Sequence, residues 1–432
     1  MVCYYVIRVN KLESVLRGDE MKSIFEKKET IIKIAKILLF MIFFLMSMEI
    51  VFTLGRNYEK KYYKAQKERA VLQKIETDRF FKINDVMNII GFKTKNHNIY
   101  TGKISGVDVT VFWDITNNFC RKNSYRYDIK RQVKKINGDY YASSKALKDV
   151  FMLDFYYKNH EIKYKEVSPQ TWYNHTKMIA HAGGAVKTQY NYNSYTNSKE
   201  AIIQNYNLGF RVFEFDVYPT SDNKMALVHD WKKFGMKNNT PFSAQQWEKF
   251  RGTSLPDFGQ SFTTMMYENL LDEMLINKDM YIITDTKSTD FSKDETKIQF
   301  EQIYKLAKKK DVHLLERIIP QIYDDDMYDI VMNVYPFKSI IYTTYATKEK
   351  ADKIIKFVSK HRNIQVITAK FEDKRFGITE VNEIHKKKKY FFNHTIDTFK
   401  NYTKARTLGA DGVYTNVLNL GDAELYESLE KR

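Results

Sequence analysis

From residue 177 to the C-terminus, short apolar runs alternate with longer stretches of helix-forming residues, and this alternation restricts the fold more than any other feature. The apolar runs have the length and the β-branched and aromatic content of strands. Eight of them occur, at residues 178–182, 212–218, 281–286, 318–323, 339–344, 364–369, 389–393 and 412–415. Helical stretches are expected between most of them, at residues 198–207, 297–310, 327–334, 348–360 and 398–408. Repeated strand–helix units predict a parallel sheet, and eight units predict an α/β fold of the (β/α)8 TIM barrel type over residues 177–432.

The N-terminal part contains a long apolar segment. Residues 37–54 are almost continuously apolar, and together with residues 31–36 they reach the length of about 20 residues that a transmembrane helix needs. No small-residue cleavage site follows, which favours an uncleaved anchor over a signal peptide. We therefore expect a cytoplasmic tail at 1–30, a transmembrane anchor at 31–54 and a helical stalk at 55–79.

Basic residues flank this segment on both sides, so the positive-inside rule leaves its orientation open. The short tail and the large C-terminal body favour a single-pass protein of the cell membrane, with the C-terminal body extracellular. The chain carries a net charge of +17, spread along its whole length. This distribution favours attraction to an anionic membrane or cell-wall polymer over binding of nucleic acid. Cys3 and Cys120 form no CxxC pair, which excludes zinc ribbons and redox motifs of that kind.

Residues 80–165 have the pattern of a small α+β module. Residues 107–113 alternate as a strand does, and Asn137-Gly138 is a strong hairpin-turn signal. Either Ser143 or Ser144 is expected to cap a short helix, and residues 155–164 are expected to form a strand pair.

Within this module, residues 135–165 weakly resemble the small β-hairpin-plus-helix module at the N-terminus of copper amine oxidases. The resemblance covers about thirty residues and implies a spacer or wall-facing module without copper chemistry.

Two acidic residues on the second barrel strand are the strongest chemical signal. Glu214 and Asp216 are two residues apart, so their side chains point to the same side of the strand. Their strand neighbours are hydrophobic, as expected for a strand buried on both faces. A buried pair of carboxylates needs a partner or a metal, and hard divalent cations such as Ca²⁺ or Mg²⁺ prefer oxygen ligands. The simpler alternative is that both residues face solvent.

Further polar residues are expected at the same end of the barrel. His181 follows the first strand, His229 follows the second, and Asp285 and Lys287 lie at the end of the third. Because barrel sites lie at the C-terminal ends of the strands, these side chains are expected to converge, and the histidines could act as acid and base. Gly183 suits a tight turn with close backbone approach to a ligand. The alternative reading is two structural histidines and a solvated lysine.

The order of these motifs resembles the glycerophosphodiester phosphodiesterase family, within the phosphatidylinositol-phospholipase-C-like phosphodiesterase superfamily. The resemblance spans most of residues 177–432. Its motifs here are His181-Ala-Gly183, Thr196-Asn-Ser198, Glu214-Phe-Asp216, His229-Asp230, Thr284-Asp-Thr-Lys287 and Gly409-Ala-Asp-Gly-Val-Tyr-Thr-Asn416.

The resemblance implies a role for each matched residue. It implies that one divalent cation, Ca²⁺ or Mg²⁺, is bound by three metal ligands, Glu214, Asp216 and Asp285. It assigns the catalytic acid and base to His181 and His229. It also implies that Lys287 and Gly183 contact the substrate, a glycerophosphodiester that would yield glycerol phosphate and an alcohol.

Two positions depart from the family pattern. Ala182 replaces the arginine that follows the first histidine, and Asp285 replaces a longer glutamate. These departures leave two alternatives open: cleavage of intact lipid in the manner of phospholipase C or D, or a barrel that binds phosphorylated lipid or wall glycan without cleaving it. His394, near the seventh strand, is expected either to line the pocket or to pack in the core.

Overall fold

The computed structural model describes residues 70–71, 73–188, 191–250 and 262–430. The chain divides into two units, Met1–Asp78 and Arg79–Arg432, and the second holds both the small module and the barrel. The predicted tail, transmembrane anchor and most of the stalk lie outside the described residues. Among the residues that are described, no helix has the length and apolar character that crossing a membrane requires.

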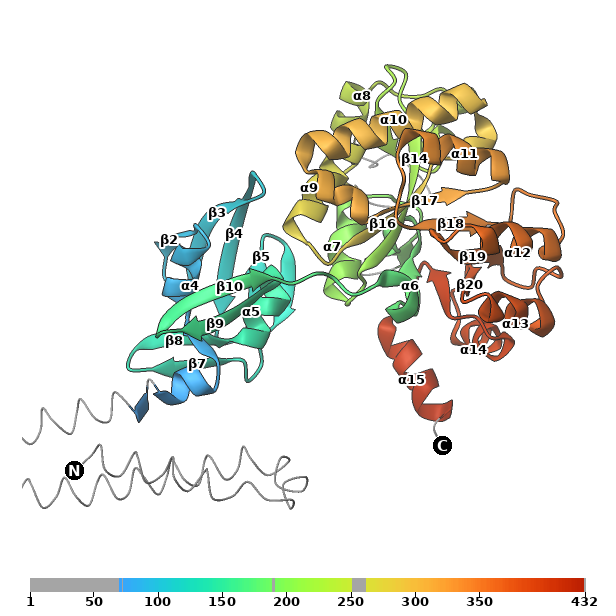
Figure 1. Cartoon of the computed structure of the whole chain (residues 1–432). Helices are drawn as coiled ribbons and strands as arrows, with labels where there is room; N and C mark the ends of the chain where they lie inside the picture. Colours follow the sequence, from blue (N-terminus) through green and yellow to red (C-terminus); the bar gives the residue numbers. More distant parts are fainter. Residues whose placement is uncertain (1–69, 72, 189–190, 251–261, 431–432) are drawn as a thin grey trace, which may run out of the picture. The chain divides into compact units, whose positions relative to one another are not determined.

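The small module is an α+β arrangement of three antiparallel sheets (Figure 1). One sheet has the order β1-β8-β7, a second the order β2-β3-β4-β5-β6, and β9 and β10 form a hairpin. The elements are β1 (Phe80–Lys82), α4 (Ile83–Ile89), β2 (Lys93–Asn96), β3 (Ile99–Ile104), β4 (Val107–Asp114), β5 (Phe119–Lys122), β6 (Tyr125–Asp128), β7 (Val133–Ile136), β8 (Asp139–Ser143), α5 (Ser144–Phe151), β9 (Leu153–Lys158) and β10 (Glu161–Glu166).

Local sequence signals in this module are confirmed. Asn137 and Gly138 form the two-residue turn between β7 and β8, both with positive φ (51° and 91°), as this type of hairpin turn requires. Ser143, rather than Ser144, caps α5 by accepting a hydrogen bond from the backbone N–H of Ala146 at 3.1 Å.

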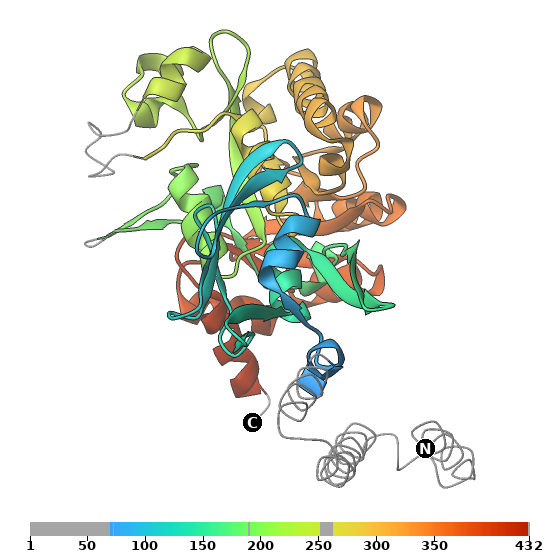
Figure 2. The same ribbon diagram turned by 90° about the vertical axis from the view of Figure 1, so that its left-hand side faces the viewer.

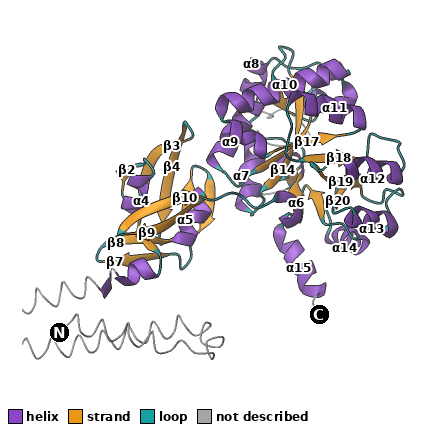
Figure 3. Ribbon diagram, in the orientation of Figure 1, coloured by secondary structure: helices purple, strands orange, loops and turns teal. Residues whose placement is uncertain are grey.

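The barrel has eight parallel strands, and it closes because β11 pairs with both β21 and β14 (Figures 1 and 3). All eight predicted strands are present. They are β11 (Met178–Ala180), β14 (Val212–Pro219), β16 (Tyr281–Asp285), β17 (Ile318–Ile322), β18 (Ile340–Thr343), β19 (Ile364–Lys370), β20 (Tyr390–His394) and β21 (Gly412–Thr415). The short strand β15 (Met225–Leu227) adds antiparallel to the end of β14.

The five predicted helices are also present, as α7 (Lys199–Asn207), α10 (Lys293–Lys310), α11 (Asp325–Val334), α12 (Ala351–Lys360) and α14 (Phe399–Leu408). Among the described residues that follow the small module, five further helices were not predicted: α6 (Trp172–His175), α8 (Ala244–Lys249), α9 (Tyr267–Ile276), α13 (Ile378–Lys386) and α15 (Leu420–Glu430). Seven of the ten residues of helix α9 are buried, so most of its circumference packs in the core and its amphipathic pattern is weak in the sequence.

The barrel interior is filled by one apolar layer beneath a polar one. Each of the eight strands contributes one residue to the apolar layer: Ile179, Val212, Ile283, Ile319, Ile341, Val366, Phe392 and Tyr414. Trp172 closes the N-terminal end of the barrel and donates its indole N–H to Ser339 Oγ at 3.1 Å. Because this end is plugged, a ligand can approach only from the C-terminal ends of the strands.

Two segments extend outward from the barrel between consecutive strands, and we call them excursions. The hairpin of β12 (Val186–Lys187) and β13 (Tyr192–Asn193) follows β11, and the segment with η3 (Trp231–Phe234) and α8 follows β15. Figure 2 shows both on the same side of the barrel. The second excursion has its own aromatic core, in which the Trp231 and Trp247 rings meet edge to face at 5.1 Å.

Candidate active site

Three buried carboxylates meet at the C-terminal ends of β14 and β16. Glu214, Asp216 and Asp285 are 1%, 0% and 4% exposed, and one oxygen from each lies within 4.8 Å of the others. Asp216 is directly opposite Asp285 in the parallel register of the two strands. The predicted spacing of Glu214 and Asp216 thus places both on the inner face of the barrel, next to the third acid.

Each carboxylate is oriented by a specific donor. The backbone N–H of Ala182 donates to Glu214 Oε2 at 2.7 Å, and Asn197 Nδ2 donates to Asp216 Oδ2 at 2.9 Å. The Tyr323 hydroxyl donates to Asp285 Oδ1. Glu214 Oε1, in contrast, is buried and has no hydrogen-bond partner among the described residues.

Lys287 lies inside the acidic cluster. Its ammonium is 2.6 Å from Asp216 Oδ1 and 2.7 Å from Asp285 Oδ2. Burial acts to lower the pKa of Lys287, but the carboxylates of Asp216 and Asp285 outweigh it and hold the pKa well above its usual value. The lysine predicted to contact substrate is therefore a permanent cation that neutralises two of the three acids.

The cluster also separates the two carboxylates of β14 electrostatically. Burial, followed by the charges of Asp216 and Asp285, raises the pKa of Glu214 well above its usual range. For Asp216 burial acts in the same direction, but Lys287 and the two nearby histidines outweigh it and lower the pKa. Of these two carboxylates, Asp216 therefore carries charge the more readily.

His181 is held by a chain of hydrogen bonds from the end of β21. Its Nδ1 lies 3.1 Å from Asn416 Oδ1, and Asn416 Nδ2 donates to Asp397 Oδ2 at 2.8 Å. Because Asp397 fixes the direction of the amide, Asn416 presents its oxygen to His181, so Nδ1 carries the proton. Nε2 then faces the cluster, 3.8 Å from Glu214 Oε2. Burial lowers the pKa of His181 and keeps it neutral.

His229 is held by the residue that follows it. Its Nδ1 lies 2.7 Å from Asp230 Oδ2, so this ring too directs Nε2 away from its supporting carboxylate. The second oxygen of Asp230 accepts the backbone N–H of Lys233 at 3.0 Å and begins η3. One carboxylate thus fixes both the histidine and the excursion that follows it.

Tyr195 contacts both histidines, a role that was not predicted from the sequence. Its ring meets His181 edge to face at 4.9 Å and His229 at 5.3 Å between centroids. Burial, followed by the charges of Asp216 and Glu214, raises the pKa of Tyr195 to about 12, so the phenol stays neutral. A lone tyrosine ahead of a helix cap gives no signal of this role.

The opposite wall is formed by Tyr323, Tyr345 and His394. Tyr345 meets Tyr323 at 5.2 Å and His394 at 5.8 Å, and its hydroxyl lies 3.5 Å from Asp285 Oδ2. Burial, followed by the charge of His181, lowers the pKa of His394 to about 3. Of the two readings for His394, the structure favours the pocket wall.

The backbone conformation and close packing of the loop after His181 require small residues. Ala182 and Gly183 have φ of 51° and 82°, and a Cβ on Gly183 would lie 2.8 Å from the Phe215 ring. The Gly183 carbonyl accepts a hydrogen bond from Asn205 at 3.0 Å. The close approach predicted for Gly183 is therefore made to Phe215 in this structure, and contact of Gly183 with substrate stays a prediction.

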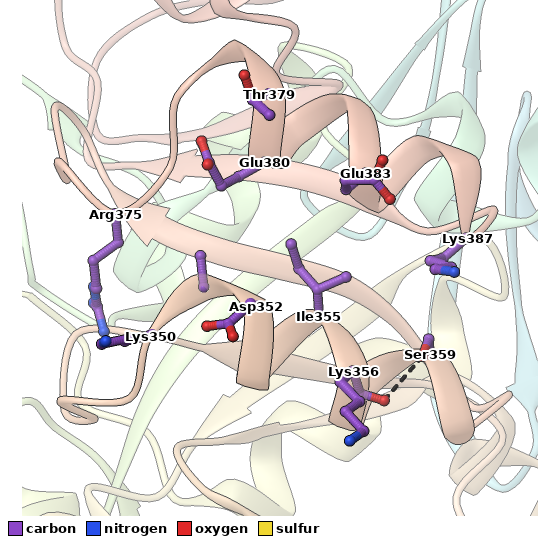
Figure 4. A pocket seen from close by; sticks show the side chains of 11 residues that line it. Lys350, Asp352, Ile355, Lys356, Ser359, Arg375, Thr379, Glu380, Glu383 and Lys387 are labelled. Carbon is purple, nitrogen blue, oxygen red and sulfur yellow. Dashed lines mark hydrogen bonds between the residues drawn. The ribbon is translucent and has the colours of Figure 1, made fainter.

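A separate hollow of about 580 Å³ lies between α12 and α13. Figure 4 shows Asp352, Ile355 and Lys356 on one side and Glu380 and Glu383 on the other. It contains no histidine and none of the residues described above. The chemistry therefore belongs to the acidic cluster within the barrel.

Comparison with known proteins agrees with this geometry. The model of the Glycerophosphoryl diester phosphodiesterase family matches residues 185–420, which is more than half of the chain. The chain belongs to this family. It is accordingly a phosphoric diester hydrolase of the glycerophosphodiester phosphodiesterase kind.

Several solved structures are similar to the chain at low identity. A putative glycerophosphoryl diester phosphodiesterase from Silicibacter pomeroyi is 13% identical (TM-score 0.47) and covers 59% of this chain and 94% of its own. One from Parabacteroides distasonis is 17% identical (TM-score 0.47), with 60% and 99% covered. An Oleispira antarctica phosphodiesterase in complex with the product sn-glycerol-3-phosphate is 13% identical (TM-score 0.44), with 59% and 97% covered. No curated protein matches the chain.

Proposed function

We propose that this member of the glycerophosphodiester phosphodiesterase family hydrolyses glycerophosphodiester-type substrates to glycerol phosphate and an alcohol, with the help of one divalent cation. The observation that carries the proposal is the convergence of three buried carboxylates and two separately supported histidines at the open end of the barrel.

The acidic cluster fits a hard cation such as Ca²⁺ or Mg²⁺. Its donors are carboxylate oxygens from Glu214, Asp216 and Asp285, and the buried Glu214 Oε1 lacks a partner among the described residues. When bound there, a divalent cation would withdraw charge from the phosphate oxygens. Lys287 would remain beside Asp216 and Asp285 and hold these two acids in place.

The two histidines divide the proton transfers. His181 is neutral and directs Nε2 into the site, which suits removal of a proton from the attacking water. His229 is supported by Asp230 and suits delivery of a proton to the leaving alkoxide. Tyr195 touches both rings and would keep them in position beside a bound phosphate.

The test uses the full-length chain with glycerophosphocholine or glycerophosphoglycerol and Ca²⁺ or Mg²⁺, and follows release of glycerol 3-phosphate. His181→Ala and Glu214→Gln should each lower kcat by about 100-fold or more. His385→Ala is the matched control, because His385 pairs with Asp411 at 2.9 Å at the opposite end of the barrel. Release that is independent of metal, or equal losses in all three variants, would contradict the proposal.

The location of the enzyme remains a proposal as well. We propose that residues 31–54 anchor the chain in the cell membrane with the barrel outside, on the sequence pattern alone. Protease accessibility of the barrel in intact cells would test it, and protection of the barrel would contradict it.

A further inference from the structure

Lys233 brings a positive charge to the rim of the site. Its ammonium lies 4.1 Å from the centre of the Tyr195 ring, the same ring that touches His181 and His229. The side chain is half-buried, and no carboxylate of the described residues lies within 4 Å of its ammonium. Its charge is therefore available to a ligand that reaches the two histidines.

The position of Lys233 is fixed by its surroundings. Trp231 and Phe234, on the same short 3₁₀ helix, are buried in the aromatic core of the excursion. Asp230 holds the backbone N–H of Lys233 at 3.0 Å while its other oxygen holds His229. Lys232, the neighbouring lysine, is exposed, and in a 3₁₀ helix adjacent side chains point about 120° apart.

The balance of charges in the site leaves Lys233 as a cation that can interact with negative charge on the substrate. With one divalent cation bound, Lys287 and that cation would together balance the carboxylates of Glu214, Asp216 and Asp285. A phosphodiester then adds one negative charge, and a further phosphate on its alcohol side adds more. The residue after His181 is alanine, so that position supplies no cation. Lys233 is the cation that Tyr195 holds beside the histidines.

We infer that Lys233 selects the substrate: it favours phosphodiesters whose leaving alcohol carries a second phosphate and disfavours a leaving group with a quaternary ammonium. The inference rests on the proposed function and adds the class of leaving group. A fixed ammonium attracts a phosphate and repels a trimethylammonium group over the same distance. Because Lys233 occupies the face of Tyr195, that face is closed to a choline head group.

The experiment measures kcat and KM of the full-length chain for glycerophosphocholine, glycerophosphoglycerol and glycerophosphoglycerol phosphate. The wild type should prefer the substrate with the second phosphate. Lys233→Gln should raise KM for that substrate by about fivefold to tenfold with little change in kcat, and Lys233→Glu should reverse the preference toward glycerophosphocholine. Lys232→Gln is the matched control and should leave the preference unchanged.

The outcomes separate the two proposals. Equal effects of the Lys232 and Lys233 variants, or a preference that Lys233→Glu does not change, would overturn the inference while leaving the phosphodiesterase intact. Turnover of none of the three substrates would overturn the proposed function, and this inference with it. A wild-type preference that declines as salt is added, together with its loss in Lys233→Gln, would support the inference.

Discussion

At the residue scale, function depends on which nitrogen of each histidine is free. Asp397 orients Asn416, which holds Nδ1 of His181, and Asp230 holds Nδ1 of His229. Both rings therefore offer Nε2, but only His229 is supported directly by a carboxylate. This asymmetry is the basis for giving the two rings different roles.

The leaving group distinguishes those roles. A glycerophosphodiester with a p-nitrophenol leaving group needs no proton from the enzyme, because p-nitrophenolate is a stable anion. We expect His229→Ala to lose about 100-fold or more in kcat with glycerophosphocholine but less than about tenfold with the p-nitrophenyl ester, whereas His181→Ala loses both activities. Steady-state rates measure this. Equal losses of His229→Ala on the two substrates would show that His229 is not the proton donor.

A buried lysine of the small module gives a prediction for stability. Lys122 is 2% exposed, and its ammonium donates to the carbonyl of Val150 at the end of α5 at 2.6 Å. Burial lowers the pKa of Lys122 from 10.5 to about 8. Between these two pH values the unfolded chain binds more protons than the folded one, so the contribution of Lys122 to stability rises with pH and is lost as pH falls through 8.

The measurement is urea unfolding at pH 7.5 and pH 10. The free energy of unfolding of the wild type, relative to Lys122→Met, should increase by up to about 3 kcal/mol at the higher pH. Lys148→Met, on the exposed side of α5, should show no such change. If the difference in free energy of unfolding between the wild type and Lys122→Met stays constant with pH, the burial of the ammonium would be contradicted.

At the element scale, the loop after β11 is defined by its contacts with α7. Asn205 Nδ2 donates to the carbonyls of Gly183 at 3.0 Å and Ala185 at 3.3 Å. Gly184 has a φ of 83°, and a Cβ there would lie 2.4 Å from Asn205 Nδ2. The loop that carries His181 thus depends on the absence of one methyl group.

Gly184→Ala should lower the free energy of unfolding by about 2–4 kcal/mol, because backbone strain adds to the steric conflict with Asn205. Gly138→Ala is the control: its φ is 91°, but no atom lies within 4 Å of its Cβ position, so only the strain of about 1 kcal/mol remains. Chemical denaturation compares them. Equal losses in the two variants would show that Asn205 moves aside at no cost.

At the scale of the whole molecule, the small module and the barrel share buried polar contacts within the unit Arg79–Arg432. The Tyr125 hydroxyl donates to Glu273 Oε2 at 2.7 Å, and Lys199 lies 3.1 Å from Glu273 Oε1. Tyr127 donates to Asn277 at 3.1 Å. These bonds attach the small module to the barrel, and its role as a spacer or wall-facing module stays a prediction.

Removal of one such bond tests this coupling. Tyr125→Phe leaves the buried Glu273 without its hydroxyl donor and should lower the free energy of unfolding by about 1–2 kcal/mol. Tyr156→Phe, which alters an exposed ring of β9, should stay within about 0.5 kcal/mol. Thermal unfolding of the full-length chain should remain a single transition over the module and the barrel. Separate transitions would indicate independent folding.

The sequence alone determined the features that depend on local periodicity and turn chemistry. Strand periodicity placed Glu214 and Asp216 on one face of β14, and Asn137-Gly138 set its hairpin, because side-chain direction and turn type depend on neighbours in the chain. The eight strands followed from their apolar runs. The membrane anchor, predicted in the same way, lies outside the described residues.

Only the tertiary structure decided which residues complete the site. Asn416 reaches His181 across 235 positions of sequence, Tyr323 reaches Asp285 across 38, and Tyr195 touches two histidines that follow different strands. Closure of the barrel brings β21 beside β11, and no local pattern records that pairing. The physical reason is that the two-residue period of a strand determines which way a side chain points. Which residues that side chain contacts depends on how distant strands pack.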